Sequence, residues 1–548
     1  MPSSPNPATA PASPASPDGL DVLVVGAGFA GLYLLHRLRG LGLRALALEA
    51  GAGIGGTWYW NRYPGARCDV ESMDYSYSFD PALEQEWSWT RRYPGQAEIL
   101  GYIEHVADRF DLRRDVRTDT RACAAAWDGV DRVWRVRTDG GDTFAARYLV
   151  MATGCLSIPK APGIDGLERF QGRVFHTGRW PHEEVDFTGR RVAVIGTGSS
   201  GIQAVPVTAE AAAEVTVFQR TANFSLPAND RPLAPDEQEA VKRRYREHRA
   251  QARRSPTGIP GRKAERSAFD VSEEERTATY WEAWERGGLF GMLRSYNDLS
   301  TDADANATAA DFIRARIAET VDDPGTAEAL APRSHPFGTK RPCIDSGYYT
   351  TFNRDGVRLV DLRAEPLAGA TTDGVATARR EYPADDLVLA TGYDAMTGAL
   401  TAVDPRGRGG LRLREAWTEG PTAHLGLAVA GFPNMFTVTG PGSPSVLSNM
   451  VVSIEQHVEW ITDLIASARE RGAQVVEADP EAQRQWVAHV QEVAGATLFP
   501  RADSWYMGAN VPGKPRVFMP YPGGVDVYRD VLEQVEASGY EGFHLSRA

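Results

Sequence analysis

LDVLVVGAGFAGLYLLHRLRGLGLRALALE, residues 20–49 of the 548-residue chain, decides the fold of its first part. Its opening apolar run predicts a buried parallel strand, which leads into a glycine turn, a helix and a second strand. The turn is Gly26-x-Gly28-x-x-Gly31. In such a βαβ unit the first glycine permits the tight turn, the second lets the backbone approach a diphosphate, and the third lets the helix pack on the strand. The stretch therefore predicts a dinucleotide-binding unit whose helix N-terminus faces the phosphates.

Glu49 stands at the end of the second strand of this unit. A carboxylate at that position accepts hydrogen bonds from the ribose hydroxyls of an adenosine. The same carboxylate would repel a 2′-phosphate. The first unit therefore predicts a site for FAD or NAD and not for NADP.

A second unit of the same kind begins with the predicted strand at residues 191–195 and continues into Gly196-x-Gly198-x-x-Gly201. The next strand of this unit is followed by Arg220 and not by an acid. A guanidinium binds a phosphate through two parallel hydrogen bonds and suits the 2′-phosphate of NADP(H). The second unit is therefore predicted to bind NADP(H).

Composition and helix signals divide the rest of the chain. The N-terminus is almost entirely Pro, Ala and Ser, which cannot bury enough apolar surface to order itself. Ser272-x-x-Glu275 is a capping box within a helical region, and Ser453-x-x-Gln456 is expected to open a long helix near the C-terminus. We predict an α/β fold with two Rossmann-like domains and a helical insertion: a disordered tail at residues 1–19, an FAD-binding domain at residues 20–150 and 385–548, an NADP-binding domain at residues 151–225 and 335–384, and the insertion at residues 226–334.

The charge and cysteine content limit the possible partners. A net charge of −13 excludes a general affinity for nucleic acid or anionic membrane. The four cysteines lack CxxC spacing, so we expect neither a metal site nor a disulfide framework, and a reduced cytoplasmic location. We also expect no signal peptide, no membrane span, and a monomer or weak homo-oligomer.

Two further stretches carry information about how the nucleotide sites are arranged. FQGRVFHTGRWPH, residues 170–182, lies between the two glycine turns and must set how the two sites face each other. GGTWYWNRYPGARCD, residues 55–69, has neither a helical nor an alternating period. It predicts an ordered loop against the first nucleotide, although an aromatic core plug would have a similar composition.

These stretches closely resemble the two signatures of type I Baeyer–Villiger monooxygenases, in the branch of phenylacetone and steroid monooxygenases. One signature is G-G-x-W-x-x-x-x-Y-P-G-x-x-x-D, matched at residues 55–69. The other is F-x-G-x-x-x-H-x-x-x-W-P-(D/H), matched at Phe170, Gly172, His176, Trp180, Pro181 and His182. The resemblance covers nearly the whole chain after the tail. Simpler flavin-containing monooxygenases share the glycine turns, but the tryptophan-proline end separates this family from them.

The resemblance implies an enzyme that uses FAD, NADPH and O₂ to convert a ketone into an ester or lactone through a C4a-peroxyflavin. It identifies Arg341 as the active-site cation and Asp69 as its carboxylate partner. Arg220 and Lys340 resemble the pair that recognises the 2′-phosphate, and Trp505 resembles a residue near the nicotinamide ribose. His176 is expected to act on domain coupling and not as a general base. Further cofactor contacts are expected from Gly56, Thr57, Trp58, Tyr75, Ser199, Ser200 and Thr221.

The resemblance also implies a substrate pocket bordered by Cys155, Leu156, Ser445, Val446, Leu447 and Met450. Cys155 stands where relatives carry glutamine. The smaller side chain would enlarge the pocket or remove a hydrogen-bond donor, or it is a silent packing change. The expected substrate is a cyclic or aryl ketone, or a bulky terpenoid or steroid-like ketone.

Three other functions use the same nucleotide-binding units. A pyridine-nucleotide disulfide reductase needs two neighbouring redox cysteines after the first glycine turn, where Cys68 stands alone. An N- or S-oxygenating flavin monooxygenase has the same cofactors and stays open. A noncatalytic nucleotide sensor has no need for Arg341 and Asp69.

Overall fold

The first sheet contains the predicted strand of residues 20–25 near its centre. The computed structural model describes residues 19–261 and 263–547, so residues 1–18 of the predicted tail lie outside the described part. The strand order is β17-β4-β5-β6-β1-β2-β3, and β18 also pairs with β6. The bounds are β1 Leu20–Val25, β2 Ala45–Leu48, β3 Val116–Arg117, β4 Ala122–Asp128, β5 Val133–Thr138, β6 Thr143–Met151, β17 Pro405–Arg406 and β18 Met435–Thr437.

Helices from both ends of the chain cover this sheet. They are α1 Phe29–Gly40, α3 Pro81–Glu86, α4 Gln96–Arg109, α15 Met450–Glu470, α16 Pro480–Gly495 and α17 Val525–Ala537. Helix α1, which follows the first glycine turn, packs along α15. There Tyr33 donates to Glu459 over 3.0 Å and Arg37 pairs with Asp463 at 2.6 Å. Residues more than 400 positions apart therefore form one layer.

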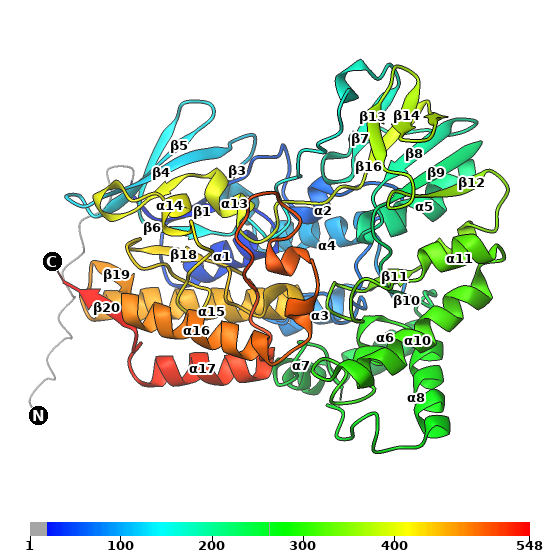
Figure 1. The fold of residues 1–548 in the computed structure, drawn as a ribbon. Helices are drawn as coiled ribbons and strands as arrows, with labels where there is room; N and C mark the ends of the chain where they lie inside the picture. Colours follow the sequence, from blue (N-terminus) through cyan, green and yellow to red (C-terminus); the bar gives the residue numbers. More distant parts are fainter. Residues whose placement is uncertain (1–18, 262, 548) are drawn as a thin grey trace, which may run out of the picture.

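The second sheet is entirely parallel, in the order β12-β9-β8-β16-β7, and lies beside the first (Figure 1). Its strands are β7 Arg173–His176, β8 Arg191–Ile195, β9 Glu214–Gln219, β12 Val357–Asp361 and β16 Asp386–Leu389, and α5, Ser199–Ala211, connects β8 to β9. A small antiparallel sheet lies beside it, formed by β13 Leu367–Ala370, β14 Gly374–Thr377 and β15 Glu381–Pro383.

The strand β16 corrects one predicted boundary. The division at residue 385 assigned this strand to the first domain, yet β16 pairs with β7 and β8 of the second sheet. Asp386 explains its place, because this fully buried carboxylate binds Arg173 through two 2.7 Å hydrogen bonds and also binds Arg190. The return to the first sheet follows β16 and does not precede it.

The region predicted as an insertion is helical between residues 235 and 330. Ser272 caps α8 as expected, since its hydroxyl accepts from the Glu275 N–H over 3.2 Å. A two-stranded ladder closes the base of the region, formed by β10 Ser225–Pro227 and β11 Cys343–Asp345. The helices are α6 Pro235–Lys242, α7 Tyr245–Arg253, α8 Glu273–Arg286, α9 Leu289–Leu293, α10 Ala303–Thr320 and α11 Pro324–Leu330.

The long C-terminal helix α15 begins earlier than predicted. Asn449 caps it by accepting from the Val451 N–H over 3.1 Å. Ser453 lies inside the helix and bonds the hydroxyl of Ser448, and Gln456 is buried without a hydrogen-bond partner among the described residues. The predicted box is therefore wrong, because an asparagine one turn earlier is an equally good cap and starts the helix first.

Shorter elements complete the fold. The predicted loop at residues 55–69 contains one helical turn, so the expectation of an irregular segment was partly wrong there. These elements are α2 Thr57–Trp60, α12 Tyr348–Thr351, α13 Gly398–Ala402, α14 Leu413–Ala416, β19 Val475–Ala478 and β20 Phe543–Ser546. In the part of the chain that the structure describes, no helix is both long and apolar enough to cross a membrane.

Candidate active site

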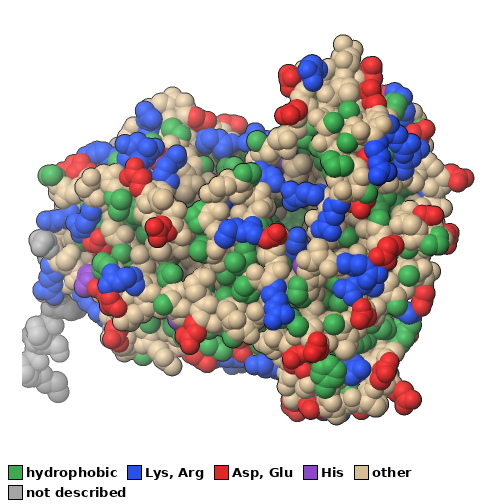
Figure 2. Space-filling view, viewed as in Figure 1, with side chains coloured by type: hydrophobic (Ala, Val, Ile, Leu, Met, Phe, Trp, Pro, Cys, Tyr) green, Lys and Arg blue, Asp and Glu red, His purple; other side chains and the backbone are tan. Residues whose placement is uncertain are grey.

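A cavity of about 970 Å³ lies between the two sheets. The surface is hollowed there, and Lys and Arg side chains gather around the depression (Figure 2). Both glycine turns line the cavity, as do the turns at residues 152–154 and 390–392 that follow β6 and β16. The carboxyl ends of parallel strands thus meet at one cavity, which is where open α/β sheets bind ligands.

The glycines of the two turns occupy different environments. Gly26 has a positive φ of 107°, and a Cβ there would lie 2.5 Å from the carbonyl oxygen of Ala152. Gly198 borders open space, since a Cβ there would meet nothing within 4 Å. Gly31 and Gly201 do not line the cavity, because each third glycine presses against the carbonyl of the first glycine in its turn. Gly31 and Gly201 therefore allow each helix to pack closely against the preceding strand and turn.

Glu49 is buried at the cavity wall, where it closes the first glycine turn. Its two carboxylate oxygens accept from the backbone N–H groups of Ala27 and Gly51, each over 2.9 Å. Burial raises the pKa of Glu49, while these hydrogen bonds oppose the shift. The carboxylate keeps acceptor capacity beyond these two bonds.

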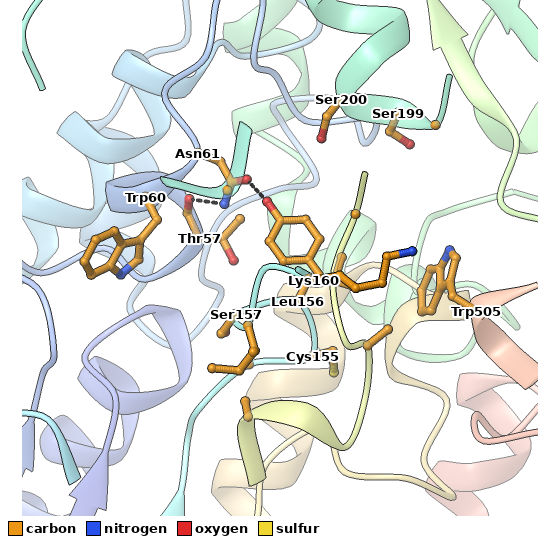
Figure 3. A pocket seen from close by; sticks show the side chains of 18 of the residues that line it. Thr57, Trp60, Asn61, Cys155, Leu156, Ser157, Lys160, Ser199, Ser200 and Trp505 are labelled. Carbon is orange, nitrogen blue, oxygen red and sulfur yellow. Dashed lines mark hydrogen bonds between the residues drawn. The ribbon is translucent and has the colours of Figure 1, made fainter. Parts of the chain in front are cut away.

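The predicted contacts on the 55–69 segment also reach the cavity. Gly56, Thr57, Trp58 and Asp69 line it, together with Tyr75. The indole N–H of Trp58 donates to the Tyr75 hydroxyl over 3.2 Å, which fixes both rings. Figure 3 shows Thr57 and Asn61 on the same side of the cavity, and Asn61 donates to the Thr57 carbonyl over 2.9 Å.

Cations line the part of the cavity near the second turn. Arg220, Thr221 and Lys340 all line it, together with Ser199 and Ser200. Neither Arg220 nor Lys340 forms an ion pair within the described residues. Burial lowers the pKa of Lys340, and the nearby charge of Arg220 lowers it further. An unpaired cationic cluster of this kind is suited to an anionic ligand.

Lys160 is a third cation of this cluster, and sequence reasoning missed it. Its ammonium group donates to the Asn510 carbonyl over 3.0 Å and points toward Trp505 (Figure 3). Burial and then the charge of Arg220 lower its pKa. No motif marks Lys160, and only the approach of the 505–518 loop reveals its position.

Arg341 and Asp69 form a two-bonded ion pair at the cavity wall, as expected from the resemblance. Nε and Nη2 of Arg341 donate to the two carboxylate oxygens of Asp69, both over 2.8 Å, and Nη1 donates to the Val446 carbonyl over 2.6 Å. The side chains are only 20% and 18% exposed. Burial opposes the charge of Arg341, but Asp69 outweighs it and holds the pKa of Arg341 above its ordinary range. The guanidinium is therefore a permanent, oriented cation with two of its five N–H groups outside these bonds.

Four of the six predicted substrate-pocket residues line the cavity: Cys155, Leu156, Val446 and Met450. Ser445 and Leu447 do not line it, because Ser445 is fully buried and Leu447 packs into an apolar cluster behind the wall. The Cys155 thiol donates to the Thr439 carbonyl over 3.1 Å, and burial raises its pKa to about 11. The thiol is thus neutral. Thr439 and Ile454 also line the wall and were not predicted.

None of the six signature residues between the turns lines the cavity. Trp180 is buried, with its ring centroid 5.1 Å from that of Phe175. His176 accepts from the Gly178 N–H over 3.0 Å, and burial lowers its pKa. His182 contacts the Tyr59 ring at 4.7 Å, which joins the segment to the 55–69 loop. Phe170, Gly172 and Pro181 likewise lie away from the cavity lining.

The sequence of the chain is similar to those of known proteins. Residues 23–277 match the model of the family described as pyridine nucleotide-disulphide oxidoreductase. A Baeyer–Villiger monooxygenase of Pseudooceanicola batsensis is 41% identical over 95% of both chains. A phenazine N-monooxygenase of Lysobacter antibioticus is 42% identical, over 96% of this chain and 97% of that protein.

The fold is also similar to that of a solved structure. A structure described as oxidised steroid monooxygenase bound to NADP has a TM-score of 0.92 and 53% identity, over 96% of this chain and 99% of that one. The family model covers the two nucleotide-binding units, whereas these relatives extend over almost the whole chain. All four cysteines are free, so no disulfide of a reductase is formed.

Proposed function

The chain belongs to the type I Baeyer–Villiger monooxygenases, and on that premise we propose the part that each cavity residue plays. Enzymes of this family use FAD, NADPH and O₂, and they insert one oxygen atom beside a ketone carbonyl to give an ester or lactone. The chain is accordingly an FAD- and NADPH-dependent oxidoreductase. What remains to be assigned is which side chains hold the cofactors, which stabilise the reacting atoms, and which ketone is used.

The first glycine turn suits FAD. Gly28 lines the cavity, and a Cβ there would lie 3.4 Å from the backbone of Gly56, on the side where a diphosphate would approach. We assign Gly26, Gly28 and the N-terminus of α1 to the diphosphate and Glu49 to the adenosine ribose.

The second glycine turn suits NADPH. The open space beside Gly198 fits a diphosphate at the N-terminus of α5. Arg220 and Lys340 are assigned to the 2′-phosphate, because neither cation has a carboxylate partner in the part of the chain that the structure describes. Trp505 is assigned to the nicotinamide ribose.

Arg341 is the side chain to which we assign stabilisation of the charge that develops during the reaction. FAD, reduced by NADPH, supplies the activated oxygen when it is bound. As the ketone carbonyl is attacked, its oxygen gains negative charge, and a fixed guanidinium in a partly buried site stabilises that charge. Arg341 stays protonated at any working pH, so no proton need be moved to keep this charge in place. Asp69 holds the guanidinium plane through two hydrogen bonds and leaves other N–H groups for the reacting atoms.

One observation carries this proposal, namely the Arg341–Asp69 pair on the wall of a cavity that both glycine turns share. The test is a panel of ketones of graded size incubated with the FAD-loaded enzyme, NADPH and O₂, with products identified by mass. We expect products that gain one oxygen and that saponification cleaves, an ester into an acid and an alcohol and a lactone into a single hydroxy acid. NADPH consumption that no ketone accelerates would contradict the proposal.

The substrate is proposed to be a bulky cyclic, aryl or steroid-like ketone. Cys155 is a small buried residue at the wall, and the neighbouring Leu156, Val446 and Met450 are apolar. The likeness to a steroid monooxygenase supports the same class. Within the panel, the ratio kcat/KM should be higher for fused-ring ketones than for cyclopentanone.

A second candidate activity is N-oxygenation. It is favoured by the 42% identity with a phenazine N-monooxygenase. The same assay with an aromatic N-heterocycle separates the two, because an N-oxide also gains one oxygen but resists saponification. If only N-oxides form, the ketone assignment is replaced by this one.

A further inference from the structure

The helix of the second nucleotide turn, α5, contacts the chain segments that carry both members of the Arg341–Asp69 pair. Gln203 makes the contact on the Asp69 side. Its amide N–H donates to the Arg67 carbonyl over 3.1 Å, and its amide oxygen accepts from the Arg67 N–H over 3.4 Å. The same oxygen accepts from the Tyr63 hydroxyl over 2.8 Å. One side chain therefore holds the backbone of the residue two positions before Asp69.

The backbone itself approaches the helix at this point. Gly65 has a positive φ of 80°, and a Cβ there would collide with the Gln203 carbonyl oxygen and lie 3.1 Å from Val207. Burial raises the pKa of Tyr63 to about 12, so its hydroxyl stays protonated and remains a donor to Gln203. The loop and the helix thus form a tight interface that has no room for slippage.

The Arg341 side of the pair is held by the first residue of the same helix. The Ser199 hydroxyl lies 3.3 Å from the Cys343 thiol, two positions after Arg341. Asn223 donates to the Arg341 carbonyl over 3.0 Å and to the Cys343 sulfur over 3.3 Å. Ser199 also lines the cavity. The N-terminal part of α5 is therefore in contact with the proposed nucleotide site and with the two chain segments that carry Asp69 and Arg341.

We propose that Gln203 is a positioning residue that couples occupancy of the second nucleotide site to the geometry of Asp69 and Arg341. This inference rests on the proposed roles of that site and of Arg341. A dinucleotide phosphate at the N-terminus of α5 pulls on the helix through its backbone N–H groups. The helix passes that displacement to Arg67 through the Gln203 amide, and so to Asp69. The cation is then in place for the reacting oxygen when NADP(H) is bound.

The replacement Gln203→Glu targets the proposed contact, and because Gln203 also lines the cavity, an NADP⁺ titration is needed to detect any direct effect on the nucleotide. It keeps the size of the side chain and an oxygen that accepts from Tyr63. It removes the one N–H donor that the Arg67 carbonyl has among the described residues and puts a carboxylate oxygen beside that carbonyl. Tyr63→Phe removes one of the three hydrogen bonds without adding charge, and Glu210→Gln is the matched control on the exposed side of the same helix.

The experiment uses the FAD-loaded enzyme and two readouts. The first is the change in the flavin absorption spectrum on titration with NADP⁺, which needs no ketone. The second is the fraction of consumed NADPH that appears as hydrogen peroxide in the presence of ketone. We expect Gln203→Glu to bind NADP⁺ with an affinity within about 3-fold of that of the parent. The coupling between the second nucleotide site and the Arg341–Asp69 pair should fall by about 5-fold. In Gln203→Glu the amplitude of the flavin spectral change then drops and the peroxide fraction rises. For both readouts, Tyr63→Phe should give values between those of the parent and of Gln203→Glu.

Two results would overturn the inference. One is a folded Gln203→Glu enzyme whose spectral change and peroxide fraction equal those of Glu210→Gln. The other is a loss of NADP⁺ affinity large enough to explain both effects, which makes Gln203 a direct ligand. If Gln203→Glu fails to fold, Tyr63→Phe decides alone, and unchanged readouts there reject the coupling. A parent enzyme that oxidises no ketone rejects the proposed reaction, whereas the NADP⁺ titration still tests Gln203.

Discussion

Replacing Asp69 with asparagine tests the chemical assignment most directly. The carboxylate accepts from Nε and Nη2 of Arg341, both over 2.8 Å. A carboxamide of the same shape has one oxygen, so its NH₂ group must face one of the two N–H donors. At least one charge-assisted hydrogen bond, about 1.5–3 kcal/mol, is therefore lost.

The size of the catalytic effect follows from that loss. If the hydrogen bond serves only to hold Arg341 against the charge that develops in the transition state, kcat falls by about 10- to 150-fold, at 1.36 kcal/mol for each factor of ten. The KM for NADPH should change little, because Arg220 and Lys340, which we assign to the 2′-phosphate, lie near the second glycine turn and do not contact Asp69. The assay compares the initial rate of ester formation, followed by product mass, with the rate of NADPH oxidation.

Asp386→Asn is the matched control. Asp386 is fully buried and holds both Arg173 and Arg190, but it does not line the cavity. Removing its charge should lower the unfolding free energy by about 1.5–3 kcal/mol and lower the melting temperature without changing kcat per folded enzyme, because Arg173 and Arg190 are 41% and 35% exposed and can be hydrated. Parent-like kcat in Asp69→Asn would refute the reasoning, and an equal loss of kcat in Asp386→Asn would show that the effect is global.

Three further outcomes are expected. Arg341→Ala should bind FAD, seen in the visible spectrum, yet form no ester; a normal ester yield is the contrary result. Replacing Arg220 and Lys340 together with alanine should lower the NADPH-to-NADH ratio of kcat/KM by about 100-fold, given about 1.5 kcal/mol for each lost phosphate contact. A hydrogen bond from Arg191 lowers the pKa of Asp385 to about 2, so the stability that this carboxylate adds is complete above pH about 4 and is lost as the pH falls toward 2. Asp385→Asn should abolish that part of the acid dependence of the unfolding free energy, as measured by urea titration at several pH values.

The βαβ units could be predicted because their signals are local. A buried strand, three glycines and the residue that ends the next strand lie within about 30 positions, and each has a steric or electrostatic reason in the backbone. Helix starts are local too, but Asn449 and Ser453 are both competent caps. Only the packing of the loop before α15 selects the first of them.

The site could not be assembled from the sequence pattern alone. Arg341 and Asp69 are 272 positions apart, and no periodicity brings them together. Their pairing was expected only through the family resemblance. Lys160 and Gln203 were missed, since each acts through a loop from another part of the chain, at Asn510 and at Arg67. Neither position has a local pattern that marks it.

The six motif residues of the segment 170–182 mark the family although none of them lines the cavity. The last residue of β7, His176, pairs with Leu389 of β16. The turn at residues 390–392, which lines the cavity, follows Leu389 directly. A few residues later His182 contacts Tyr59, beside the first nucleotide site. The segment therefore runs from the strand pairing at His176, past Gly178 and Arg179 on the cavity wall, to the exposed side chain of His182. We propose that this segment sets the spacing of the two nucleotide sites, while the charge proposed to stabilise the reacting oxygen comes from Arg341 on a different part of the chain.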